Sequence, residues 1–262
     1  MTLLQAIILA IVEGLTEFLP ISSTGHMVLT SYMMGIEENT FVKSFEVIIQ
    51  FGAILAVLVV YWKRFLPNWG FYKKLFVAFL PTAIIGFVVK GYVDILLGQA
   101  EVVAWSFIIG GVILIWTDKF FAKYNDEGRT IEQLSYKDSI LLGLFQSIAM
   151  IPGVSRSAAT IIGGLSLKMN RKEAAEFSFF LAVPTLAAAT LYKGVKLLKD
   201  IESSQIHLLI VGNVIAFAVA ILAIKSFIRF LSSHGFKYFG YYRILMGLIF
   251  LVMIYAGVEL KV

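Results

Sequence analysis

A cluster of polar side chains near the N-terminus has the residue types that catalysis needs. Its members are two acids, three hydroxyls and a histidine: Glu13, Glu17, Ser22, Ser23, Thr24 and His26. Apolar stretches lie on both sides, so we expect the cluster to lie within a membrane. Ionisable groups at that depth cost about 2.5–3.5 kcal/mol each on insertion scales and are usually retained for function. The reaction centre is therefore expected here.

The two acids, Glu13 and Glu17, are one helical turn apart and share one face of a helix. Two carboxylates that close, away from bulk water, cannot both stay ionised unless a cation lies between them. The pair could bind a divalent cation, Mg²⁺ or Ca²⁺, through oxygen, with a substrate phosphate completing the coordination shell. A protonated pair, or a hydrogen bond to a neighbouring helix, is the alternative without a metal.

The hydroxyl run follows Pro20 and precedes a second apolar segment. One of these side chains would suffice as the N-cap of the next helix, so three of them suggest a further role. A helix N-terminus also attracts anions, and we expect Ser22 and Thr24 to bind substrate there. His26, at the start of the same helix, is placed to take a proton from an attacking hydroxyl or water near neutral pH.

A second polar break interrupts an apolar region in the other half of the chain, at residues 152–157. Gly153 lets the backbone approach a ligand closely, and Ser155 can cap the following helix. Arg156 would oppose the helix dipole unless an anion is held there, and its planar guanidinium suits a phosphate. The alternative is an ion pair between Arg156 and one of the N-terminal acids. Two further donors of this region are Ser157 and Thr160.

Together the two breaks suit phosphoryl transfer, in which positioning and charge neutralisation do most of the work. Because the surrounding walls would face lipid, we expect the substrate to be an amphiphile with a phosphorylated head group.

The composition is that of a polytopic membrane protein. Of 262 residues, 59% are hydrophobic and 15% are charged, whereas soluble domains are about 25% charged. A helix needs about 20 apolar residues to cross the hydrocarbon, which leaves room for about ten helices and no soluble domain. We attribute the net charge of +5 to basic cytoplasmic loops rather than to nucleic-acid binding. The absence of cysteine excludes disulfides and thiolate metal sites.

The apolar segments predict an all-α fold with six transmembrane helices and two re-entrant helical hairpins. The short segments flank the polar breaks, at 3–19 with 25–36 and at 139–151 with 158–167. The longer segments are 45–62, 76–92, 102–116, 176–192, 207–230 and 242–256. We interpret each short pair as a hairpin whose irregular backbone is buried inside protein.

This pattern of one short pair and three spans occurs twice, over residues 1–131 and 132–262. A shift of about 133 residues aligns Gln146 with Glu13 and residues 155–157 with residues 22–24. An odd number of spans in each repeat inverts the second repeat relative to the first. We therefore expect the two breaks to meet, and we include Gln146 among the substrate-binding residues.

Basic residues are distributed unevenly across the predicted topology. Fifteen Lys and Arg residues, Arg243 among them, fall on one side and six on the other. Because Lys and Arg collect in cytoplasmic loops, the first side is expected to be cytoplasmic. Both termini and the mouth of the first hairpin are then extracytoplasmic.

Both motifs resemble those of the undecaprenyl pyrophosphate phosphatase (bacitracin-resistance protein) family. Residues 13–26, EGLTEFLPISSTGH, resemble its acidic first motif, and residues 152–160, PGVSRSAAT, resemble its second. Ala158 stands where that family usually has glycine. The chain length and the repeat also fit, so the resemblance covers the whole chain.

The resemblance implies an enzyme of the bacterial cytoplasmic (inner) membrane that hydrolyses a long polyprenyl diphosphate to its monophosphate and phosphate. This reaction recycles the lipid carrier for peptidoglycan synthesis and confers bacitracin resistance. By the same resemblance Glu13 and Glu17 are the acidic pair that acts with a divalent cation. Ser23 is then the nucleophile, His26 the base and Arg156 the phosphate-binding arginine. The residues alone leave other nucleophiles open, namely Ser22, Thr24 and Ser155.

Parts of the sequence also fit two other functions. Inverted repeats with broken helices are typical of transporters, so a flippase of polyprenyl phosphate, or a carrier of a small anion, is the main alternative. A structural membrane subunit with buried ion pairs is a third possibility. A different phosphatase superfamily requires a histidine where this chain has Ile162, so membership of that superfamily is excluded. The glycine pair Gly110-Gly111 permits close helix packing, and a homodimer is plausible.

Overall fold

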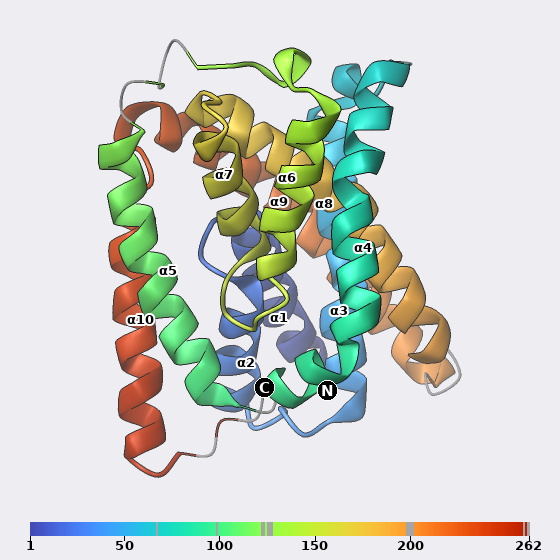
Figure 1. Ribbon diagram of the computed structural model, residues 1–262. Coiled ribbons are helices and arrows are strands. Elements are labelled where there is room, and N and C mark those ends of the chain that lie inside the picture. Colours follow the sequence, from blue (N-terminus) through green and yellow to red (C-terminus); the bar gives the residue numbers. More distant parts are fainter. Residues whose placement is uncertain are drawn as a thin grey trace.

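The computed structural model describes the whole chain except residues 67, 98, 122–123, 125–127, 198–201, 259 and 261–262. The described residues form α-helices joined by short loops and 3₁₀ turns (Figure 1). The 3₁₀ turns are η1 (Trp62–Phe65), η3 (Ile131–Gln133) and η4 (Ser203–Gln205).

Six helices of the described chain are long and apolar enough to cross a membrane. They are α3 (Thr40–Val60), α4 (Trp69–Leu97), α5 (Ala100–Phe120), α8 (Arg171–Leu197), α9 (Ile206–His234) and α10 (Lys237–Tyr255). This confirms the prediction of a multi-pass membrane protein. Several helices begin about one turn or more before the predicted span, because charged residues such as Lys73 and Lys172 belong to the helix although they end the apolar run. Such side chains can extend their charged ends to the interface.

The remaining four α-helices are too short to span. They are α1 (Leu3–Thr16), α2 (Ser23–Met33), α6 (Tyr136–Ile148) and α7 (Arg156–Ser166). The longest has 14 residues and extends about 21 Å, against about 30 Å of hydrocarbon. Figure 1 shows α6 and α7 as a hairpin whose loop lies midway along the long helices. The predicted fold class is therefore confirmed.

Local sequence explains where the hairpin arms begin and end. Thr2 and Ser135 start α1 and α6 with a capping box, in which side chain and backbone satisfy each other's free donors. Pro20 and Pro152 lie just beyond the arms, where proline prevents a helix from continuing.

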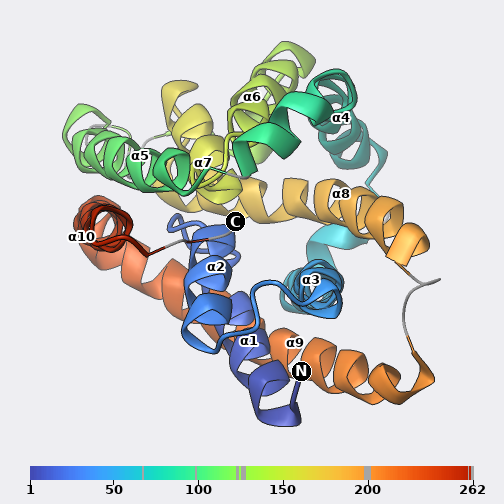
Figure 2. The ribbon, with the colours of Figure 1, turned by 90° about the horizontal axis from the view of Figure 1, so that it is seen from below.

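The two halves of the chain pack with corresponding partners. Helix α1 packs against α9, α6 packs against α4, and α5 lies along α10 at one edge of the molecule (Figures 1 and 2). Helix α3 contacts α8 and α9. These pairings agree with an inverted repeat, whose boundary between residues 131 and 132 stays a prediction.

The contact between α5 and α10 uses the glycine pair that suggested a dimer. A Cβ on Gly111 would meet the Gly240 carbonyl oxygen at 2.6 Å, and a Cβ on Gly110 would meet Arg243 Nη2 at 2.5 Å. Glycine is required at this close approach. The pair therefore packs inside the chain, and the possible homodimer gains no support from it.

Candidate active site

The two hairpin loops meet in the interior of the molecule. Ser157 at the start of α7 donates a hydrogen bond of 2.7 Å to the Leu19 carbonyl oxygen in the loop between α1 and α2. A cavity of about 150 Å³ opens beside this contact. Its lining residues are Glu17, Ser22, Ser23, Thr24, Gln50, Ala149, Met150, Pro152, Gly153, Ser155, Arg156 and Leu186. The predicted meeting of the two breaks is therefore present, and both motifs line one cavity.

Each loop enters its second helix through a serine in an unusual backbone conformation. Ser22 precedes α2 with φ 68°, and Ser155 precedes α7 with φ 75°. Positive φ is uncommon outside glycine, and such strain is often found at functional sites. In both loops the strained serine and the first residue of the following helix line the cavity.

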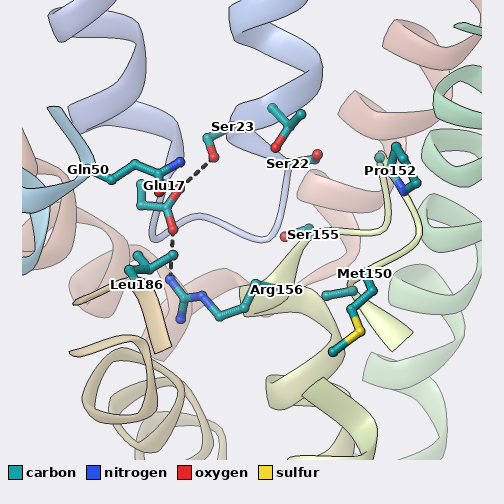
Figure 3. A pocket seen from close by; sticks show the side chains of 12 residues that line it. Glu17, Ser22, Ser23, Gln50, Met150, Pro152, Ser155, Arg156 and Leu186 are labelled. Atoms are coloured by element: carbon teal, nitrogen blue, oxygen red, sulfur yellow. Dashed lines mark hydrogen bonds and ion pairs between the residues drawn. The ribbon is translucent and has the colours of Figure 1, made fainter. Parts of the chain in front are cut away.

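Glu17 lies at the centre of the polar contacts, as Figure 3 shows. Its Oε2 accepts a 2.5 Å hydrogen bond from the Ser23 hydroxyl. Its Oε1 is 3.1 Å from Arg156 Nη2, which forms a buried ion pair between the two hairpins. The alternative role predicted for Arg156, a bond to an N-terminal acid, is thus observed.

Arg156 retains a free donor beside this ion pair. Its Nη1 donates to the Ser178 carbonyl oxygen on α8 at 2.8 Å, and its guanidinium carbon lies 5.7 Å from the centre of the Phe18 ring. Its Nε is buried and has no hydrogen-bond partner among the described residues. The side chain is therefore held in place, and its buried Nε is left as an unpaired donor.

Glu13 lies one turn behind Glu17 and away from the cavity surface. It is 1% exposed, and its Oε1 has no hydrogen-bond partner within the described part of the chain. A buried carboxylate oxygen without a partner requires either a proton or a cation. Within the described residues no group of three or more His, Cys, Asp or Glu could hold a metal ion. Two carboxylates alone would supply only part of a Mg²⁺ shell, which water and substrate phosphate usually complete.

His26 turns its ring toward α10. Its Nδ1 donates to the Ser22 carbonyl oxygen at 2.7 Å, so in the neutral ring Nε2 is the acceptor. That Nε2 lies 2.6 Å from the Tyr242 hydroxyl, and the two rings are stacked with centres 5.5 Å apart. Sequence reasoning assigned the base to His26, whereas the side chain in contact with the Ser23 hydroxyl is Glu17. Both ring nitrogens of His26 are engaged elsewhere.

Comparison with known proteins identifies the family. The family model for the bacitracin resistance protein BacA matches residues 6–249. The chain belongs to the BacA family. It is 68% identical to an undecaprenyl-diphosphatase of Bdellovibrio bacteriovorus, with 100% of this chain and 99% of the relative covered. Undecaprenyl-diphosphatases of Flavobacterium johnsoniae and Aquifex aeolicus are 51% and 48% identical, with at least 95% of each chain covered.

The one departure from the expected BacA motif does not reach the cavity. Ala158 is 2% exposed, does not line the cavity, and its backbone N–H donates to the Ser155 hydroxyl at 3.2 Å. Its methyl group is therefore accommodated by packing behind the loop.

Several predicted substrate-binding residues of this BacA chain do line the cavity, whereas others support it from behind. Those on its surface are Ser22, Thr24, Gly153 and Ser155. Ser157 joins the loops, and the Thr160 hydroxyl bonds the Ser178 hydroxyl at 2.6 Å. Gln146 lies elsewhere, because its amide donates to Thr82 on α4 and Thr185 on α8. Its alignment with Glu13 therefore does not bring it to the cavity.

Sequence reasoning missed the contribution of α10 to this BacA site, and it placed Arg243 wrongly. Arg243 was counted with the cytoplasmic residues, but it is fully buried. The apolar run begins at Tyr242, whereas the helix begins at Lys237, so Arg243 lies well inside the helix. An arginine beside a tyrosine at the edge of an apolar span is the signal that could have indicated an intramembrane role.

Proposed function

We propose that this chain hydrolyses undecaprenyl diphosphate to undecaprenyl phosphate and inorganic phosphate in the bacterial cytoplasmic membrane. The relatives above are named for this activity, and the membrane-embedded cavity combines an acid, hydroxyls and an arginine. The observation that carries the proposal is the Ser23–Glu17–Arg156 chain, which links a hydroxyl, a proton acceptor and a phosphate-binding cation.

In the proposed first step the Ser23 hydroxyl attacks the terminal phosphorus of the diphosphate. The Oγ–P bond forms, the bond from phosphorus to the bridging oxygen breaks, and undecaprenyl phosphate leaves. Glu17 Oε2 takes the hydroxyl proton, because it already accepts that hydrogen bond. Water then cleaves the phosphoserine and releases phosphate, with Glu17 again handling the proton. A direct attack by water, with Glu17 as the base, uses the same groups without a covalent intermediate.

Proton transfer to Glu17 also changes the electrostatics of the cavity. Arg156 is paired with the Glu17 carboxylate, and this pairing weakens when the carboxylate gains a proton. The guanidinium is then available to the phosphoryl oxygens, where planar, bidentate recognition is favourable. Charge neutralisation would thus increase as the phosphorus is attacked, which is what phosphoryl transfer requires.

A divalent cation is proposed as a further component, held by Glu13 and Glu17. When bound it would supply positive charge to the phosphate oxygens. The partnerless oxygen of Glu13 supports this proposal.

We also propose which side of the membrane the cavity faces. When Arg243 is left out of the count of basic residues, the remaining Lys and Arg still favour a cytoplasmic side opposite the mouth of the first hairpin. The cavity would then open on the extracytoplasmic side.

The proposal is tested by phosphate release from undecaprenyl diphosphate with purified protein in detergent. Glu17→Gln should reduce kcat about 10³-fold, since general-base catalysis contributes about 10²–10⁴-fold. Glu101→Gln, at an exposed position at the start of α5, is the matched control. Wild-type rates for Glu17→Gln would contradict the assignment of Glu17 as the general base.

In sealed vesicles, net movement of undecaprenyl phosphate without any phosphate release would favour the transporter instead.

A further inference from the structure

We infer that the last helix, α10, holds the two hairpin loops in catalytic register through Arg243, with Tyr242 as its partner. Both are positioning residues in the sense that neither lines the cavity. This inference rests on the proposed function, because register between the loops matters only if both act on one substrate.

The Arg243 guanidinium bonds a backbone carbonyl from each loop. Its Nη1 donates to the Pro20 carbonyl oxygen at 3.3 Å, in the loop after Glu17. Its Nη2 donates to the Gly153 carbonyl oxygen at 2.8 Å, in the loop before Arg156. The same nitrogen reaches the Ser106 carbonyl oxygen on α5 at 2.8 Å. One side chain therefore joins the loop carrying the acid to the loop carrying the phosphate-binding arginine.

The cost of burying this cation indicates a role beyond packing. Arg243 is fully buried, and no carboxylate lies within ion-pair distance of it in the described structure. Its charge is met by the three carbonyl oxygens and by the Phe107 ring, whose centre lies 5.0 Å from the guanidinium carbon. Apolar residues of similar volume often stabilise a core as well as buried charges do. The planar guanidinium, in contrast, has enough donors to bond carbonyl oxygens from three separate segments.

Tyr242 adds a second connection to the first loop. Its hydroxyl bonds His26 Nε2 at 2.6 Å, and the opposite ring nitrogen of His26 holds the Ser22 carbonyl at 2.7 Å. Arg243 and Tyr242 therefore fix the backbone at Pro20 and Ser22, on the N-terminal side of Ser23. This gives His26 a positioning role and accounts for the direction of its ring.

Loss of the Arg243 contacts should reduce the rate more than it weakens substrate binding. A misplacement of about 1 Å between reacting groups can cost about 100-fold in rate. Arg243→Lys keeps a cation in the same place, but a compact ammonium cannot span carbonyls from both loops. We expect its kcat to fall by about 30- to 100-fold, with KM changed by less than about threefold. Tyr242→Phe, which keeps the stacked ring, should lower kcat about threefold to tenfold.

A glycine variant tests the same contact without altering α10. A Cβ on Gly110 would meet Arg243 Nη2 at 2.5 Å, so Gly110→Ala should displace the guanidinium and lower kcat with little change in KM. Gly91→Ala is the matched control, because a Cβ there meets nothing within 4 Å. Gly110→Ala decides the question if Arg243→Lys does not fold.

A second measurement does not depend on catalysis. The chain has no cysteine, so Thr24→Cys at the start of α2 and Met150→Cys in the second loop can be spin-labelled in the full-length protein. The distribution of label distances should broaden in Arg243→Lys and Gly110→Ala but stay unchanged in Gly91→Ala. Broadening, together with no phosphate release by the unlabelled wild-type protein, would overturn the proposed function and keep the register. The inference would be overturned if both variants kept the label distances and the kcat unchanged. It would also be overturned if the loss of activity followed only the amount of folded protein.

Discussion

Glu17 and Arg156 form a buried ion pair across the two re-entrant hairpins, with Oε1 and Nη2 3.1 Å apart although 139 residues separate them in the chain. Neither hairpin crosses the membrane alone, so the pair exists only because the loops meet halfway. Both side chains line the cavity, and Glu17 also accepts the hydrogen bond from the Ser23 hydroxyl.

Replacing Arg156 by lysine should lower kcat/KM by at least about tenfold, equivalent to about 1.4 kcal/mol of transition-state stabilisation. Lysine keeps the charge but loses the planar fork that bonds Glu17 and the Ser178 carbonyl and leaves Nε free. The rates are measured with undecaprenyl diphosphate in detergent. Arg171→Lys, at an ion pair with Asp118 outside the cavity, is the control. Equal rates for the two variants would contradict a phosphate-binding role for Arg156.

Substitution of Ser23 by alanine should lower kcat about 10³-fold if this hydroxyl is the nucleophile. Ser22→Ala should cost much less, because the structure gives Ser23, not Ser22, the contact with Glu17. Mass spectrometry of protein quenched during turnover should find phosphate on Ser23. Ser166→Ala, on an exposed hydroxyl that bonds its own helix, controls for loss of a serine. A Ser23→Ala enzyme that retains about a third of its activity would favour attack by water.

The motifs and the short hairpin arms could be predicted because their signals are local. A buried break is indicated wherever proline, a run of hydroxyls and charged residues interrupt an apolar sequence. The six spans follow from the length of the apolar segments. Those features contain Glu17, Ser23 and Arg156, and the structure brings all three together.

The remaining features depend on contacts that no local pattern contains. The direction of the His26 ring is set by Tyr242, which lies 216 residues away. Arg243 was misplaced because hydropathy locates the apolar run, whereas the helix starts earlier at Lys237. The alignment of Gln146 with Glu13 was informative about the repeat but not about which hydroxyls its amide would meet. Side-chain partners across an inverted repeat need the three-dimensional packing.

Gly143→Ala should destabilise the protein by about 1–3 kcal/mol, the usual cost of overpacking a close contact. A Cβ there would collide with the Ala78 carbonyl oxygen and meet the Pro81 ring carbons at 2.9 Å, where α6 packs against α4. Thermal unfolding in detergent measures the effect. Gly194→Ala in α8, where a Cβ meets nothing within 4 Å, supplies the helix-propensity gain alone. A variant as stable as this control would show that α4 and α6 can separate without cost.

Glu13→Gln distinguishes the two ways of satisfying the buried oxygen of Glu13. If Glu13 and Glu17 hold a divalent cation, the neutral amide should raise the cation concentration needed for half-maximal activity by about tenfold or more. Wild-type activity should then be abolished by a chelator and restored by Mg²⁺ or Ca²⁺. If Glu13 is instead protonated, glutamine reproduces its shape and its donor, and both the cation requirement and the thermal stability should match wild type.

Binding of the metal alone, measured by calorimetry on both proteins, separates these outcomes independently of turnover. Wild-type metal affinity in Glu13→Gln would remove Glu13 from the proposed cation site, because the partnerless Oε1 is the atom that supports it.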